Sequence, residues 1–150
     1  MNINQLLHTH LYQAIKENDV TRKRTLRLLM ASLKLAEVAK ESELVEEEIL
    51  GIVQKEIKIK HDTIADAERA GRQDLINEAH EEIKLLEGYL PKQITQEELR
   101  ALAQQVVEEV GASSINDMGK VIKTLVNRLA GRATNQDASR VVRDILHNKS

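Results

Sequence analysis

Hydrophobic side chains recur three and four positions apart along almost the whole chain, and this spacing predicts a series of amphipathic α-helices. The expected helices, in chain order, are Ile3–Ile15, a second that ends near Lys40, about Glu46–Ala70, about Asp74–Tyr89, and Gln96–Val110. A sixth helix is expected after Ser114 and Asp117, ending at Gly131, and a seventh after Thr134. We expect Ile15 and Leu75 to face inward and His61 to be half-buried.

The breaks between these segments carry the residue types that begin and end helices. Thr95 and Glu98 have the spacing of a capping box, and Gly71 and Gly111 stand where a helix ends on a left-handed glycine. Pro91 pushes the residue before it out of the helical region. We therefore predict two domains, residues 1–90 and 91–150, on either side of Pro91.

Composition agrees with an all-α fold. The chain has 150 residues, of which 41% are hydrophobic and 31% charged, with one proline and six glycines. So few helix breakers favour long helices, and we predict an N-terminal helical bundle or set of hairpins followed by a small three-helix C-terminal domain. The absence of cysteine excludes disulfides and thiolate sites. The first residues lack a signal-peptide pattern and no apolar run reaches 18 residues, so we expect a cytoplasmic protein outside the membrane.

Charge is unevenly distributed along the chain. Residues 1–90 carry 13 Lys/Arg and 17 Asp/Glu, a net charge of −4, whereas residues 111–150 carry 7 and 3, a net charge of +4. On the sixth helix, polar and basic side chains are expected on the face opposite the Met118–Leu129 apolar stripe. We predict a nucleic-acid-binding surface made of Lys120, Lys123, Asn127, Arg128, Arg132, Arg140 and Arg143. A solvated helix face is the alternative.

Two other features have more than one interpretation. Gly119 lies inside a predicted helix, where glycine costs about 1 kcal/mol relative to alanine, so it needs a reason. Close helix packing is one reason and close approach of a nucleic-acid backbone is another. The basic run Arg22, Lys23, Arg24, Arg27 and Lys34 is expected to pair with neighbouring acidic residues or to face water, with a second contact surface as the alternative.

The sequence predicts no catalytic site, metal site or cofactor. The spacing from Gly111 to Gly119 is not that of a phosphate loop, and no strand is expected before it. None of the five histidines has metal-ligand spacing, and no carboxylate is expected alone in an apolar pocket of the kind that serves a general acid.

The stretch from Gly111 to Asn135 resembles the signature of the YqeY family. It contains Asp117-Met118-Gly119-Lys120 and, twelve positions after Gly119, Gly131 followed by Arg132-Ala133. Pieces upstream, including Gln54-Lys55-Glu56 and Tyr89-Leu90-Pro91, match the order and spacing of that family over nearly the whole chain. Lys123, Thr134-Asn135 and Val45 depart from its usual residues. A narrower similarity, confined to Gly119, Val121, Gly131 and Ala133, links the C-terminal domain to the tail of GatB, a subunit of glutamine-dependent tRNA amidotransferase.

The resemblance implies a tRNA-binding module linked to amidotransferase or translation proteins. The family's association with carbon–nitrogen ligases that use glutamine as amide donor does not extend to catalysis here, because the chain lacks the catalytic part of GatB. A protein–protein adaptor with no nucleic-acid role is the competing hypothesis. The near-absence of aromatic residues argues against stacking on unpaired bases, so any RNA would be held through its backbone and shape.

Overall fold

The computed structural model describes residues 2–149, and within that range every regular element is helical. The α-helices are α1 (Ile3–Lys16), α2 (Val20–Lys40), α3 (Glu46–Arg69), α4 (Gln73–Glu87), α5 (Gln96–Val110), α6 (Met118–Leu129) and α7 (Asn135–Lys149). A short 3-10 helix, η1 (Ile115–Asp117), precedes α6. The all-α prediction is confirmed. No helix of the described residues has the length and apolarity that a bilayer crossing requires.

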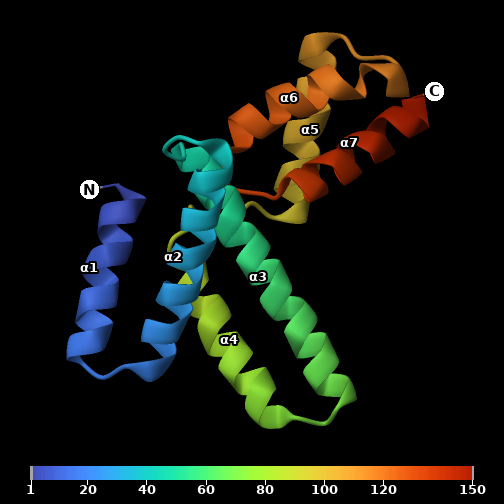
Figure 1. The fold of residues 1–150 in the computed structure, drawn as a ribbon. Coiled ribbons are helices and arrows are strands. Elements are labelled where there is room, and N and C mark those ends of the chain that lie inside the picture. The colour runs from blue at the N-terminus through green and yellow to red at the C-terminus, as the bar shows by residue number, and fades with distance from the viewer. Residues whose placement is uncertain (1, 150) are drawn as a thin grey trace. The chain divides into compact units, whose positions relative to one another are not determined.

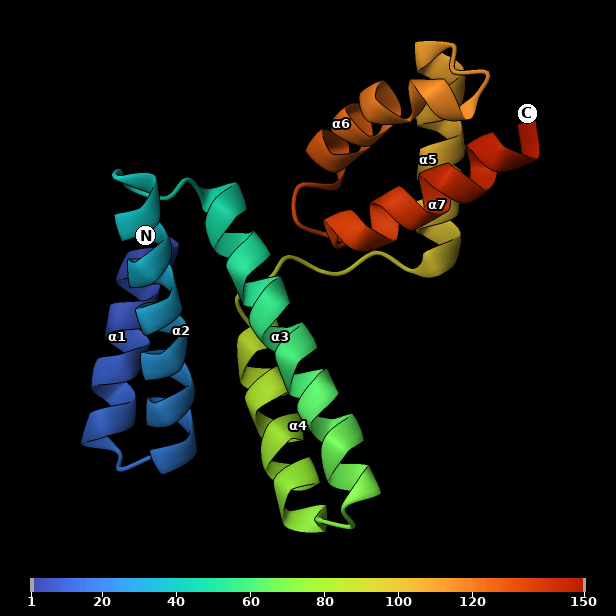
Figure 2. The same ribbon diagram turned by 45° about the vertical axis from the view of Figure 1, so that its right-hand side comes forward.

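The chain divides into two compact units, residues 1–90 and 91–150. In the first unit α1 and α2 form one antiparallel hairpin and α3 and α4 form another, as Figures 1 and 2 show. Helix α2 contacts both α3 and α4 and so joins the two hairpins. In the second unit each of α5, α6 and α7 contacts the other two.

Helix ends follow from local hydrogen bonds. The Asn2 side chain accepts from the backbone N–H of Gln5 at 2.9 Å, and the Gln5 side chain accepts from the backbone N–H of Asn2 at 3.1 Å, which completes a capping box for α1. The Thr95 hydroxyl accepts from the Glu98 N–H at 3.1 Å. Gly71 and Gly111 have φ of 67° and 69°, as expected for glycines that end helices.

Each unit has a buried apolar core. The first unit is centred on side chains from α1 to α4, namely Leu7, Leu26, Leu29, Leu33, Ile49, Val53 and Leu86. The second unit buries the inward stripes of α5, α6 and α7, including Val106, Leu125, Val142 and Leu146. Fully burying such a side chain contributes on the order of 1.5–3 kcal/mol, so these stripes fix which face of each helix turns outward.

Three side chains that we expected to face inward or to be half-buried are exposed instead. Ile15 is 45% exposed because it lies about 100° around α1 from the buried Ala14. Leu75 is 37% exposed and lies in the first turn of α4. His61 is exposed as well. At 100° per residue it lies about 60° around α3 from the buried Ile64, which takes it away from the packed seam.

The end of the sixth helix also differs from the expectation. Helix α6 ends at Leu129, and Ala130 and Gly131 follow with φ of 46° and 84°. Alanine rarely adopts this left-handed conformation. Two hydrogen bonds from the segment before α5 hold this turn. The Ile94 N–H donates to the Arg132 carbonyl at 2.8 Å, and the Gln93 side chain donates to the Gly131 carbonyl at 3.0 Å.

Candidate nucleic-acid interface

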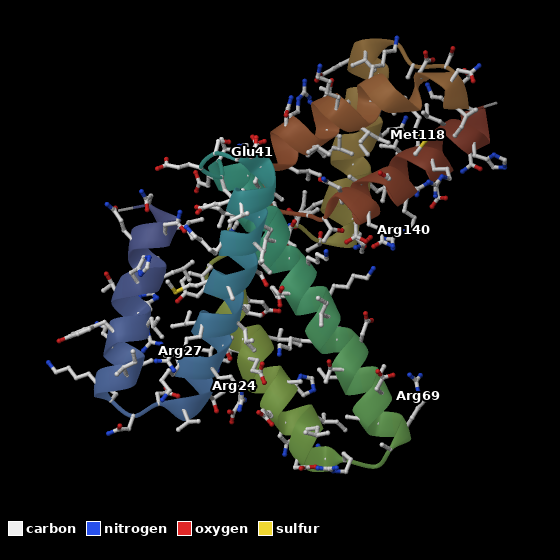
Figure 3. The ribbon with its side chains drawn as sticks, in the orientation of Figure 1. Arg24, Arg27, Glu41, Arg69, Met118 and Arg140 are labelled. Carbon is white, nitrogen blue, oxygen red and sulfur yellow. The ribbon has the colours of Figure 1, made fainter. Side chains whose placement is uncertain are left out.

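The turn that leads into α6 is organised by one carboxylate. Asp117 accepts hydrogen bonds from the backbone N–H groups of Ser113 at 2.9 Å and Ser114 at 3.3 Å. These two bonds, aided by the ammonium of Lys120, hold the pKa of Asp117 below its usual value. Asp117 is therefore an anion at neutral pH, and it satisfies backbone donors that precede the helix. Met118 is the first residue of α6 (Figure 3), and its side chain packs against the core of the second unit.

Burial of one stripe of α6 exposes the opposite face. Val121, Leu125 and Leu129 are at most 2% exposed. Side chains three and four residues apart share a helix face, so Lys120, Lys123 and Asn127 lie together, and all three are exposed. Arg128 is exposed too, but it lies about 80° around the helix from Lys120, towards α5. We call Lys120, Lys123, Asn127 and Arg128 the α6 face.

Nearby carboxylates partly neutralise this face. Arg128 pairs with Glu109 of α5, which raises the pKa of Arg128 and lowers that of Glu109. Lys120 Nζ lies 3.7 Å from Asp117 Oδ1. Lys123 has no ion-pair partner among the residues that the structure describes. Exposed ion pairs of this kind contribute little to stability.

The three remaining predicted arginines have different surroundings. Arg132 is half-buried: its Nε donates to the Lys92 carbonyl at 3.2 Å, and its Nη2 lies 3.8 Å from Glu98. Arg140 of α7 (Figure 3) donates to Gln96 at 3.0 Å and lies 3.3 Å from Asp137. Arg143 is exposed, with no ion-pair partner within the described part of the chain. Arg132 therefore serves the fold of the second unit, whereas Lys123 and Arg143 are available to a ligand.

The surroundings of Gly119 bear on the two explanations that the sequence offered for this residue. It is exposed, and a methyl group added at its Cα would meet nothing within 4 Å. Close packing against another helix of the second unit therefore does not explain this glycine. It leaves the backbone of the first turn of α6 open to solvent, one helical turn from Lys123.

A family model described as Yqey-like protein matches residues 4–146. The chain belongs to this family. The match spans both units of the YqeY-like chain, including the segment from α6 to the last turn of α7.

A curated relative matches part of this YqeY-like chain. Altered inheritance of mitochondria protein 41, mitochondrial, from Vanderwaltozyma polyspora is 33% identical over 85 residues. The match covers 56% of this chain and 46% of the relative, so the chain spans less than half of the length of that protein.

Arg24 pairs with acidic residues of a neighbouring helix, Glu78 and Glu82, which is one of the two expectations for the basic run of α2. The burial of Glu82 and the contact between Tyr89 and His10 were not predicted. Glu82 of α4 is 5% exposed, with Oε1 3.3 Å from Arg24 and Oε2 2.5 Å from Lys60. Glu82 Oε2 accepts no hydrogen bond of good geometry. The positive charge of Lys60 beside it compensates the burial of this oxygen. The Tyr89 hydroxyl lies 2.6 Å from His10 Nδ1. The contacts of Glu82 join α4 to α2 and α3, and that of Tyr89 joins the turn after α4 to α1. Neither leaves a spacing signal in the sequence. Among the described residues, no group of three His, Asp or Glu side chains is arranged to hold a metal.

Proposed function

We propose that this YqeY-like protein is a tRNA-binding module that acts together with glutamine-dependent tRNA amidotransferase systems and has no catalytic site of its own. The observation that carries the proposal is the α6 face beside the open backbone at Gly119. Two exposed lysines project from the helix there, and a methyl group added at Gly119 would meet no atom within 4 Å.

The chemistry of the second unit favours recognition of phosphates and shape over recognition of bases. Residues 91–150 contain no Phe, Tyr or Trp, so no ring is available in this unit to stack on an unpaired base. Lysine and arginine contacts to phosphates release counterions, which predicts that affinity falls by about 0.7–0.9 log units per contact for each tenfold rise in salt. A folded tRNA presents closely spaced phosphates of this kind.

The amidotransferase link rests on the similarity of Gly119, Val121, Gly131 and Ala133 to the GatB tail. In this proposal the chain helps to present tRNA, while another protein performs the amide transfer from glutamine. We expect the purified chain to show no ATP- and glutamine-dependent amidation of mischarged tRNA. Such activity in the isolated protein would refute the non-catalytic part of the proposal. A cytoplasmic location is also proposed, and cell fractionation tests it.

The experiment is a binding titration with the full chain. Fluorescence anisotropy would compare labelled folded tRNA with an unstructured RNA of equal length, at several salt concentrations. We expect weak, salt-sensitive binding that favours tRNA. Lys120→Glu combined with Lys123→Glu should abolish it and leave the helical circular dichroism unchanged, since both side chains face solvent. Lys16→Glu combined with Lys84→Glu makes the same change in net charge on exposed positions of the first unit and should have little effect.

Two results would contradict the proposal. Equal affinity for unstructured RNA would indicate non-specific attraction by charge. An absence of RNA binding at low salt, together with recovery of a protein partner, would favour the adaptor hypothesis.

A further inference from the structure

The end of the first unit, which leads into the second, is anchored to its own unit. Beyond the end of α4, the backbone N–H groups of Tyr89 and Leu90 donate at 3.0 and 3.1 Å to carbonyls in the last turn of that helix. The side chains of both residues pack against the apolar core of the first unit. The Tyr89 hydroxyl also lies 2.6 Å from His10 Nδ1 of α1. The chain is therefore held as far as Leu90, the last residue of this unit.

The residues that follow, 91–94, are held by the second unit, and we call them the strap. The Ile94 N–H donates to the Arg132 carbonyl at 2.8 Å, and Arg132 Nε donates back to the Lys92 carbonyl at 3.2 Å. The Ile94 side chain packs against the core of the second unit. This reciprocal pair of hydrogen bonds ties the strap to the turn between α6 and α7.

Gln93 extends this hold to the start of the strap. A side-chain amide has two N–H donors, and here they meet two carbonyls, that of Gly131 at 3.0 Å and that of Pro91 at 2.9 Å. The bond to the Pro91 carbonyl restrains ψ of Pro91, and the pyrrolidine ring fixes its φ near about −65°. The Gln93 side chain therefore acts as a latch that fastens Pro91 to the α6–α7 turn.

Between these two anchored stretches a single soft backbone torsion remains, ψ of Leu90. The φ torsion of Leu90 is restrained by its N–H bond and by packing, and the peptide bonds of this segment are trans and planar. A residue that precedes proline avoids the helical region, so ψ of Leu90 is itself limited to extended values. We infer that the strap, latched by Gln93, is a hinge with one soft torsion that couples the motions of the two units. The inference does not depend on RNA binding.

Distances between two spin labels, measured by double electron–electron resonance on the full chain, test this hinge. The chain has no cysteine, so Glu81→Cys on α4 and Asp144→Cys on α7 provide exposed labelling sites, one in each unit. A flexible chain as long as the strap fluctuates widely around an end-to-end distance of about 11 Å. We expect the hinge to give a clearly narrower distance distribution than a reference chain with glycines inserted after Leu90. Equal widths would overturn the inference in favour of a flexible linker.

An isosteric substitution tests the latch. Gln93→Glu replaces both N–H donors with a carboxylate that only accepts, so the side chain then faces two carbonyls to which it cannot donate. We expect the distance distribution to broaden towards that of the glycine-insertion reference. Gln13→Glu makes the same chemical change at an exposed position of α1 and should leave the width unchanged. An unchanged width in Gln93→Glu would overturn the role of the latch.

Relaxation of the backbone amide nitrogens in NMR spectra gives a second readout that needs no labels. Units that are coupled by the hinge should share one rotational correlation time in the unmodified chain. In Gln93→Glu the helices of the smaller second unit should show a shorter correlation time than those of the first. Two different correlation times in the unmodified chain would overturn the inference, whatever Gln93→Glu does to the stability of the strap.

Discussion

Replacing Gly119 by alanine should stabilise the protein while weakening its binding to tRNA. The added methyl group meets no atom within 4 Å, so it introduces no clash. Alanine loses less conformational entropy than glycine on entering a helix, and the expected gain is about 0.5–1 kcal/mol. For a unit of 60 residues this corresponds to a rise in Tm of roughly 2–8 °C. The same methyl group would occupy the space that the proposal reserves for an RNA backbone.

Gly111 is the matched control. A methyl group there also meets nothing within 4 Å, but the backbone has φ of +69°. Alanine in the left-handed region costs roughly 1–2 kcal/mol, so Gly111→Ala should destabilise the chain. Both substitutions add a methyl group into open space. The free energy of unfolding should rise in one case and fall in the other because the backbone conformations of the two glycines differ.

Urea denaturation of the full chain, followed by circular dichroism, measures the stability change, and tRNA anisotropy measures binding. Destabilisation by Gly119→Ala would refute the structural reasoning, because it would mean that the glycine is needed for packing. Stabilisation with unchanged tRNA affinity would refute the functional reasoning, because the open backbone would then have no role in RNA binding.

Three further predictions concern stability. Glu82→Ala leaves the ammonium of Lys60 without its carboxylate and should cost about 1.5–3 kcal/mol in urea denaturation; no measurable loss would show that the ion pair contributes nothing. Burial and nearby Arg22 lower the pKa of His10 below 6.5, so stability should be complete above that pH and decline as pH falls below it. His10→Gln should remove this part of the pH dependence in thermal melts, and an unchanged profile would contradict the assignment. Thr95→Ala removes the cap of α5 and should lower the free energy of unfolding by about 1 kcal/mol, whereas Thr95→Ser should be nearly neutral.

The helices could be predicted from the sequence because their determinants act within a few residues. Asn2, Thr95 and Thr134 each cap a helix through the backbone N–H three positions later. Gly71 and Gly111 end helices through their own backbone freedom. The period of 3.6 also places Lys120, Lys123 and Asn127 on the exposed face of α6 without any knowledge of tertiary structure.

Contacts between helices could not be predicted in this way. Glu82 depends on Arg24 and Lys60, which are 58 and 22 residues away along the chain. At the candidate site, Glu109 comes from α5 to pair with Arg128, and the predicted ligand-binding Arg132 donates to the Lys92 carbonyl.

The central claim is that the α6 face contacts tRNA, and ultraviolet crosslinking of the full chain in cells tests it most directly. Sequencing would identify the attached RNA, and mass spectrometry would locate the attached peptide. The account predicts that tRNA is enriched and that crosslinks lie within residues 118–132, and that Lys120→Glu with Lys123→Glu removes them. Recovery of no RNA, or of tRNA attached only to residues 1–90, would contradict the account.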